Sequence, residues 1–190
     1  MSETAELTDI PTLRARARQD IQSGAVTPSY GADRDKVVQL LNEALATEIV
    51  CVLRYKRHYF MAKGLASLSV AQEFLEHAQE EEQHADMIAE RIVQLGGEPD
   101  FSPIGLAERS HAEYVTGDSL VDMIREDLVA ERIAIDSYRE MIRFVGDRDS
   151  TTRRMLEEVL ATEEEHAEDL ASFIEEIGKW PPRLGRQATP

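Results

Sequence analysis

Four segments of the 190-residue chain carry apolar residues at the spacing that places them along one face of an α-helix. A glycine lies at or just beyond the end of each segment, as is typical of helix ends. A connector of about twenty residues separates the second segment from the third. The sequence therefore predicts an all-α fold, a four-helix bundle in which two helical hairpins are joined by a long crossover. The segments span residues 33–63, 67–95, 118–145 and 149–178.

The two ends of the chain lack this periodicity. The N-terminal part contains scattered proline and glycine and one short stretch, TLRARARQDI, that could form a helical turn. Pro181 and Pro182 prevent the fourth helix from continuing. We therefore expect three parts: an N-terminal extension over residues 1–31, the four-helix bundle over residues 32–178, and a C-terminal tail over residues 179–190.

The charge balance restricts the partners. The chain has 37 acidic and 21 basic side chains, and its net charge of -16 disfavours nucleic acid and anionic membranes but favours cations. No run of about 18 apolar residues is present, and the N-terminus lacks the basic and then apolar pattern of a secretory signal. We therefore expect a cytoplasmic protein with no membrane contact. The single cysteine, Cys51, is expected to be a buried thiol.

The stretch QEEEQHAD places three glutamates side by side in the second segment. At about 100° per residue, apolar residues lie within about 60° of Glu81 on both sides, so Glu81 is in the middle of the apolar face. Glu80 and Glu82 lie about 100° to either side, on the flank and the surface. His84 follows Glu81 by three residues and shares its face. Only one glutamate of this acidic run is therefore expected to be buried.

The same pattern recurs in every helix. Glu48, Glu131 and Glu163 each interrupt the apolar face of their own segment, and His166 follows Glu163 by three residues. The first and second glutamates are separated by nearly the same number of positions as the third and fourth. The two hairpins therefore look like pseudo-symmetric halves of one site. Tyr55 and Tyr138 occupy equivalent places, seven positions after Glu48 and Glu131.

Four buried carboxylates need a counter-charge. Burying them without compensation would cost several kcal/mol each, in a domain whose net stability is about 5 to 15 kcal/mol. Two divalent cations balance four carboxylates and two neutral imidazoles. Oxygen ligands with one nitrogen per metal suit iron or manganese, and a glutamate from each of two helices plus Glu-x-x-His from each of the other two is the ligand pattern of di-iron and di-manganese helical bundles.

From about residue 33 to residue 177, the chain resembles the ferritin-like superfamily, in particular bacterioferritin and its Dps-like relatives. The resemblance is carried by LNEALATEIV, EEEQHADMIAERI, REDLVAERI and EVLATEEEHAEDL. It implies two iron ions per subunit, with manganese possible, at one intrasubunit centre. Glu48 and Glu131 would be terminal ligands, Glu81 and Glu163 would bridge, and His84 and His166 would complete one metal each.

The resemblance also implies an activity. Proteins of this kind are ferroxidases that oxidise Fe(II) with O2 or H2O2 and store the ferric product as mineral in a hollow homo-oligomeric cage, which detoxifies iron. A manganese catalase or another di-metal peroxidase without iron storage would use the same ligands and remains an alternative. A rubrerythrin-like peroxide reductase is disfavoured because the chain has no pair of cysteines, and a metal-free structural bundle is the remaining possibility.

Several positions depart from the bacterioferritin pattern. The methionine that binds haem in that family is replaced by Glu82, so we do not expect haem. The chain ends soon after the fourth helix instead of continuing into a fifth, which favours a 12-subunit cage over a 24-subunit one. Arg183 and Arg186 make the tail mildly basic, as in Dps proteins that hold DNA, but the acidic remainder argues against a DNA partner.

Three further residues have two interpretations each. Tyr55 matches a tyrosine of bacterioferritin and is either an electron donor during oxidation or a core aromatic residue. His77 lies one turn before Glu81 and either lines the route by which iron enters or is a hydrogen-bonded core histidine. Asp127 lies one turn before Glu131 and either accepts a hydrogen bond from a ligating imidazole or forms an interhelical ion pair.

Overall fold

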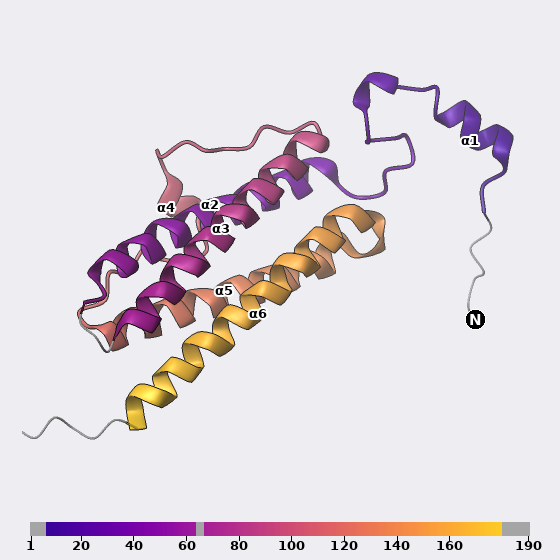
Figure 1. Ribbon diagram of the computed structural model, residues 1–190. Helices are drawn as coiled ribbons and strands as arrows, with labels where there is room; N and C mark the ends of the chain where they lie inside the picture. The colour runs from indigo at the N-terminus through magenta and orange to yellow at the C-terminus, as the bar shows by residue number, and fades with distance from the viewer. Residues whose placement is uncertain (1–6, 64–66, 180–190) are drawn as a thin grey trace, which may run out of the picture.

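The computed structural model describes residues 7–63 and 67–179 of the chain. Its four long helices pack as two antiparallel hairpins, α2 with α3 and α5 with α6 (Figure 1). The hairpins meet where α2 contacts α5 and where α3 contacts α6. The described residues contain no strand, so the predicted all-α bundle is confirmed. The helices are α2 (Arg34–Met61), α3 (Leu68–Gln94), α5 (Leu120–Val145) and α6 (Ser150–Lys179).

The helices begin close to the predicted positions. The side chain of Asp33 accepts the backbone N–H of Lys36 at 3.1 Å, and that of Ser119 accepts the N–H of Asp122 at 3.2 Å. Such caps satisfy backbone donors that have no partner within the helix. The predicted stop at Gly64 lies outside the described residues, and α6 continues one residue past the predicted end at residue 178.

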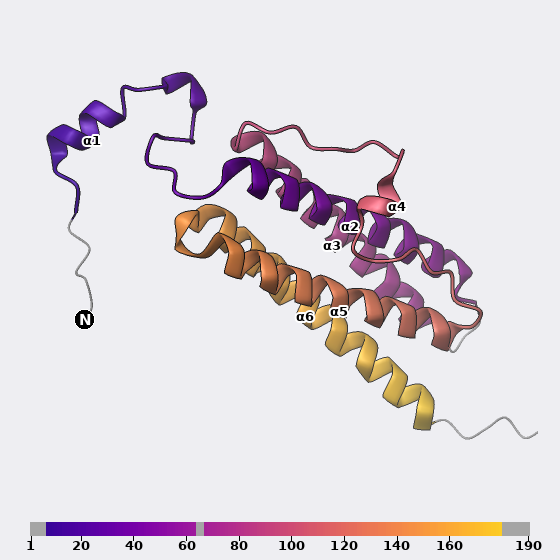
Figure 2. The same ribbon diagram turned by 180° about the vertical axis from the view of Figure 1, so that it is seen from behind.

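The crossover between the hairpins runs along α2, as Figure 2 shows, and carries the short helix α4 (Leu106–Arg109). Asn42 of α2 anchors it twice, since its side chain donates to the Glu98 carbonyl at 3.1 Å and accepts the Asp100 N–H at 2.7 Å. Thr47 accepts the backbone N–H of His111 at 2.9 Å. These bonds hold a connection that spans the length of the bundle.

The N-terminal region has one part away from the bundle and one part against it. Helix α1 (Ile10–Arg16) and a 3-10 turn, Ile21–Ser23, lie beyond the end of the bundle and contain no buried residue (Figures 1 and 2). Closer to α2, Tyr30 packs on the core and donates its hydroxyl to Asp149 at 2.8 Å. Asp149 also pairs with Arg91 of α3 at 2.9 Å, so this contact joins the extension to both hairpins.

The core consists of two apolar clusters, one toward each end of the bundle, and each cluster contains residues from both hairpins. The first contains Leu41 and Leu45 of α2 together with Ile88 of α3, and the second contains Phe74 of α3 and Leu170 of α6. Along every long helix, the predicted buried glutamate lies between residues of the first cluster and residues of the second. The polar side chains therefore form a layer in the middle of the bundle. None of the described helices is long and apolar enough to cross a membrane.

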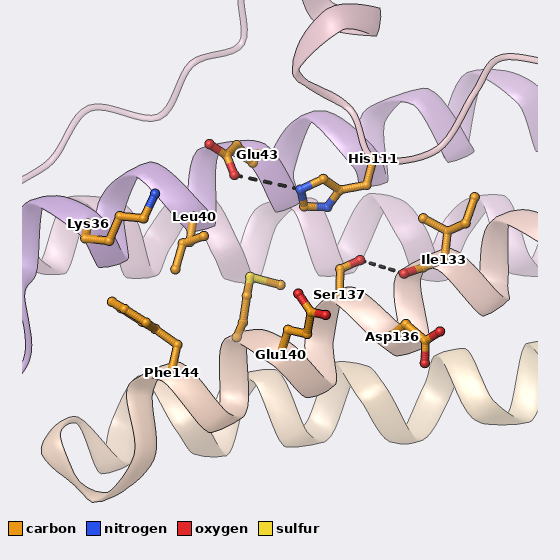
Figure 3. Close-up of a pocket in the computed structure, with 10 residues that line it drawn as sticks. Lys36, Leu40, Glu43, His111, Ile133, Asp136, Ser137, Glu140 and Phe144 are labelled. Carbon is orange, nitrogen blue, oxygen red and sulfur yellow. Dashed lines mark hydrogen bonds and ion pairs between the residues drawn. The ribbon is translucent and has the colours of Figure 1, made fainter.

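A surface groove of about 480 Å³ lies between α2 and α5 (Figure 3). Leu40 and Phe144 line it, and Glu43 forms an ion pair with His111 at 3.8 Å. None of the six predicted metal ligands lines this groove. The candidate chemistry therefore lies inside the bundle.

Candidate metal centre

The structure brings the six predicted metal ligands together at the centre of the bundle. Each long helix supplies one glutamate, and α3 and α6 each add a histidine one turn further along. No residue of the six is more than 5% exposed. They are Glu48 from α2, Glu81 and His84 from α3, Glu131 from α5, and Glu163 and His166 from α6.

The candidate ligand atoms form two groups of four residues, and within each group the atoms lie within 4.8 Å of one another. Glu81 and Glu163 belong to both groups. This geometry suits two adjacent metal positions with two carboxylates between them. Glu48 and His84 complete the first group, and Glu131 and His166 complete the second.

The two imidazoles turn their Nδ1 atoms toward the carboxylates. His84 Nδ1 lies 2.9 Å from Glu163 and 3.4 Å from both Glu48 and Glu81. His166 Nδ1 lies 3.7 Å from Glu81 and within 4.0 Å of two further carboxylates. Each group therefore receives one nitrogen donor.

Two tyrosines hold the unshared glutamates from across the bundle. Tyr55 of α2 donates its hydroxyl to Glu131 of α5, and Tyr138 of α5 donates its hydroxyl to Glu48 of α2 at 2.5 Å. Burial, together with the nearby carboxylates, raises the pKa of both phenols well above the usual value. Both tyrosines therefore stay protonated donors, and each fixes one carboxylate oxygen in place.

Buried polar atoms without hydrogen-bond partners indicate whether cations fit this site. Every one of the six candidate ligands has at least one side-chain nitrogen or oxygen that is buried without a hydrogen-bond partner. Leaving such an atom unpaired costs about 1 to 3 kcal/mol, and more when it is charged. Carboxylate oxygens with one imidazole nitrogen per position are suitable ligands for Fe(II) or Mn(II). The residues present therefore fit a pair of such cations.

The carboxylates disturb one another's protonation. Burial, and then the charge of Glu81, raises the pKa of Glu48 to about 8. Burial and the three other carboxylates also raise the pKa of Glu163. Burial acts in the same direction on Glu81, but its close polar contacts with Glu48, His166 and His84 outweigh burial and lower the pKa of Glu81. Without cations, protons therefore take part of the neutralising role.

The pKa values of the two imidazoles are raised, whereas burial alone would lower them. Burial disfavours the imidazolium form, but the close carboxylates of Glu163, Glu48 and Glu81 raise the pKa of His84. Burial again opposes the charge of His166, and the nearby carboxylates of Glu81, Glu131 and Glu80 raise its pKa to about 9. Both rings would have to lose a proton to become metal ligands, so cation binding should release protons.

Glu80 lies on the flank of α3, as its helical position predicts, but it has a partner that the sequence did not reveal. Its Oε2 atom lies 2.7 Å from His166 Nε2. A carboxylate on the far nitrogen orients an imidazole whose other nitrogen binds metal. Of the acidic run, only Glu82 is fully a surface residue, where it pairs with Lys56 at 3.4 Å. The sequence could not predict this contact, because Glu80 belongs to α3 and its partner His166 belongs to α6.

Asp127 forms the interhelical ion pair, not a bond to a candidate ligand imidazole. Its carboxylate accepts from Arg54 Nε at 2.8 Å and lies 2.7 Å from His58 Nδ1. All three residues are almost completely buried, and their remaining polar atoms reach carbonyls of the crossover at Glu113 and Thr116. Sequence reasoning missed Arg54 and His58, because a charged residue on a helix does not reveal its partner on another.

His77 lies next to the centre and is buried, with 2% of its surface exposed. Its ring stacks on the His166 ring with 3.9 Å between centroids, and its Nδ1 atom lies 3.3 Å from the Tyr55 hydroxyl oxygen. Burial, and then the charge of His166, lowers the pKa of His77 to about 3, so its ring is neutral. Cys51 is buried as expected, and burial raises the pKa of its thiol.

We predict that the metal-free protein loses stability as the pH rises from about 4.5 to about 9. Glu48 binds its proton more tightly in the folded chain than at its ordinary pKa of 4.5, so its contribution disappears as the pH approaches about 8. The contribution of His166 is complete below 6.5 and is lost as the pH rises through about 9. Thermal unfolding of chelator-treated protein should show the falling midpoint.

Three comparisons test the origin of this pH dependence. Glu48→Gln removes a titrating group and should flatten the curve, whereas Glu82→Gln removes an exposed carboxylate and should leave it unchanged. Mn(II)-saturated protein should not show the decline, because cations replace the protons. A thermal unfolding midpoint that rises with pH in the metal-free protein would contradict the raised pKa values of Glu48 and His166.

Comparison with known proteins gives an independent result. The model of the ferritin-like domain family matches residues 38–179. Bacterioferritin from Desulfovibrio desulfuricans is 26% identical over 147 residues, which make up 75% of this chain and 78% of that protein. A nutrient stress-induced DNA-binding protein from Nostoc sp. is 33% identical over 143 residues, or 73% of this chain and 77% of that protein.

Solved structures agree with the sequence matches. The bacterioferritin-related protein of Bacteroides fragilis, described as a dodecameric thioferritin, is similar with a TM-score of 0.75 and 32% identity, over 78% of this chain and 90% of that one. Dps from Thermosynechococcus elongatus has a TM-score of 0.71 at 21% identity, over 74% and 90% of the two chains, and shows likeness in fold alone. The family match and these relatives bear out the resemblance, and the chain belongs to the ferritin-like domain family.

Proposed function

We propose that this protein is a ferroxidase that oxidises Fe(II) at the buried centre and stores the ferric product. The observation that carries the proposal is the pair of ligand groups that share Glu81 and Glu163. Two Fe(II) ions held between the same two carboxylates are close enough to react with one oxidant molecule. The six residues named above are the proposed ligands, and two iron ions per chain are the proposed substrate load.

The charges of the site suit this reaction. Four carboxylates and two neutral imidazoles balance two Fe(II) ions, so the buried layer becomes neutral when both are bound. Each Fe(II) gives one electron, and two electrons with two protons reduce H2O2 to two water molecules or O2 to H2O2. The oxidised pair carries two additional positive charges. Two hydroxide ions or one oxide ion, formed from water with release of protons, restore neutrality, and the ferric product either stays at the centre or moves into the interior of the cage.

Tyr55 is proposed as an additional electron donor, which supplies the second electron to the oxidant when the centre holds only one Fe(II) ion. Its hydroxyl already donates to Glu131, so the loss of an electron from the ring can be accompanied by transfer of the phenolic proton to that carboxylate. His77 Nδ1, at 3.3 Å, can then stabilise the phenoxyl oxygen as a hydrogen-bond donor. Tyr138 has the equivalent bond to Glu48 but no such histidine contact among the described residues.

Storage needs a closed shell, and the relatives support one. The Bacteroides fragilis protein, 32% identical to this chain, is described as dodecameric. We propose a homo-oligomeric cage, with 12 subunits favoured over 24. The relative from Nostoc sp. is named a DNA-binding protein. The net charge of -16 opposes contact with a polyanion, so DNA forms no part of this proposal, and the basic residues of the tail lie outside the described residues.

The three adjacent glutamates allow a graded test. We predict that Glu81→Ala slows Fe(II) oxidation by at least about 100-fold because it removes a ligand shared by both positions. Glu80→Ala should slow it by about 10-fold to 100-fold, since it removes only the partner of His166. Glu82→Ala should oxidise Fe(II) at the wild-type rate, because that side chain is 61% exposed and pairs with Lys56. Initial rates can be followed by the absorbance of Fe(III).

Gel filtration must show the same assembly for all three variants, so that a loss of rate is not a loss of fold. Wild-type oxidation by Glu81→Ala would remove the buried centre from the mechanism. Equal slowing by all three variants would mean that the oxidation rate depends on the total negative charge of this segment and not on the position of Glu81 in the buried centre.

The role of Tyr55 can be separated from packing by comparison with Tyr138. Tyr55→Phe should abolish a tyrosyl radical signal in samples frozen within milliseconds of mixing Fe(II)-loaded protein with oxidant. Tyr138→Phe removes the equivalent hydroxyl from the other half of the site and should retain the signal. A radical of undiminished intensity in Tyr55→Phe would assign Tyr55 to the core alone.

The amount of iron retained distinguishes storage from a di-metal enzyme of the manganese catalase kind. After anaerobic addition of excess Fe(II) and admission of oxidant, we expect the protein to retain ferric iron far beyond about two ions per chain on gel filtration. Retention of only about two ions, with release of O2 from H2O2 and no consumption of iron, would favour the peroxidase alternative.

A further inference from the structure

A second cluster of candidate ligands lies beside the buried centre, on the side of His77 that faces away from Tyr55. One ligand atom from each of Glu73, His77 and Asp169 lies within 4.8 Å of the others. His77 Nε2 is 3.5 Å from Glu73 Oε1 and 4.0 Å from Asp169 Oδ2. Helix α3 supplies Glu73 and His77 one turn apart, and α6 supplies Asp169. None of these three residues was among the predicted ligands.

The hydrogen bonds of His77 determine which of its nitrogens carries the proton. Tyr55 uses its only hydroxyl hydrogen in the bond to Glu131. The contact between His77 Nδ1 and the Tyr55 oxygen is therefore a hydrogen bond only if Nδ1 donates. In a neutral imidazole with a proton on Nδ1, the Nε2 atom has a free lone pair, which is the form that binds metals.

This lone pair has no partner. His77 is 2% exposed, and its Nε2 atom is buried without a hydrogen bond. The two oxygens that it faces belong to carboxylates, which accept hydrogen bonds and cannot donate them when ionised. Three electron-rich atoms therefore converge without a donor between them. A cation in this space would satisfy all three.

No arginine or lysine of the described residues forms an ion pair with this cluster, and the other positive charge that acts on Glu73 is that of His166, which is lost when His166 becomes a metal ligand. In the part of the chain that the structure describes, Glu73 and Asp169 have His77 as their ion-pair partner. Their side chains are 26% and 45% exposed, so one side of the cluster is open to solvent. Water can complete the coordination of an ion there, and the ion can exchange.

The cluster is one aromatic ring away from the buried centre. His77 stacks on His166, with 3.9 Å between the ring centroids and 20° between their planes. His166 belongs to the second ligand group of the centre. A cation held at Glu73 and Asp169 would therefore lie between solvent and the buried pair.

We propose that Glu73, His77 and Asp169 bind a third divalent cation, and that Fe(II) occupies this solvent-facing site on its way to the buried pair. Two carboxylates and one imidazole suit Fe(II), Mn(II) or Zn(II). The binding site stands on its own geometry, whereas its place on the route of Fe(II) rests on the proposed function.

Mn(II) is the probe for the binding site, because it resembles Fe(II) in its ligands but is not oxidised during the measurement. Crystals of the full-length protein soaked in Mn(II) should show three anomalous scattering peaks per chain, one of them between Glu73, His77 and Asp169. The double variant E73Q/D169N should lose this peak and keep the two at the centre. Equilibrium dialysis should show the same loss of one ion per chain.

The matched control is E76Q/E168Q. It removes one carboxylate from α3 and one from α6, as the test variant does, but both residues are exposed and outside the cluster. This control should retain all three ions. With Fe(II) as substrate at limiting concentration, E73Q/D169N should oxidise iron about 10-fold more slowly than the control, as expected when a supporting ligand set is lost.

The outcomes separate this inference from the proposed function. Two ions at the centre and none at Glu73 would overturn the third site and leave the ferroxidase centre in place. An ion at the third site with none at the centre would support the third site and overturn the proposed function. Three ions with equal oxidation rates in both double variants would overturn the role of the site on the route of Fe(II).

Discussion

The burial of four carboxylates in one layer of the bundle is the constraint on which the rest of the structure depends. The layer is buried between two apolar clusters, so water cannot hydrate its charges. Uncompensated, it would consume a large part of the stability of the fold. In the metal-free chain, raised pKa values of Glu48 and Glu163 and two proton-binding imidazoles reduce the charge. Cations would do so completely, which links the stability of the protein to its load of metal.

The residues around the layer hold it in shape whether or not cations are bound. Tyr55 and Tyr138 each reach from one hairpin to a glutamate of the other, so the two halves of the site are tied together by hydrogen bonds that remain when the carboxylates are ionised. In the adjacent apolar half, the buried pair of Arg54 and Asp127 connects α2 with α5 and fixes the end of the crossover. A preorganised site would avoid the cost of ordering its ligands when a cation binds.

The exposure of the acidic side chains differs between the buried centre and the outer cluster of Glu73, His77 and Asp169, as a route for Fe(II) from solvent to the centre requires. The six candidate ligands are almost fully buried, whereas Glu73 and Asp169 are open to solvent on one side. His77 lies between the two environments, with Nδ1 toward Tyr55 and Nε2 toward the outer carboxylates. The surface groove of about 480 Å³ between α2 and α5 is lined by none of these groups, so the groove does not mark the candidate chemistry.

The sequence by itself determined the fold and the inner residues of the site. Helical periodicity is a local property, and about 100° per residue is enough to decide that Glu81 faces inward while Glu82 faces outward. The tertiary structure alone decided the contacts between helices. Glu80 meets His166, Asp127 meets Arg54, and Asp169 approaches His77 because of the rotation and offset of neighbouring helices. Periodicity contains no information on these quantities, since they are set by how side chains from different helices pack against one another.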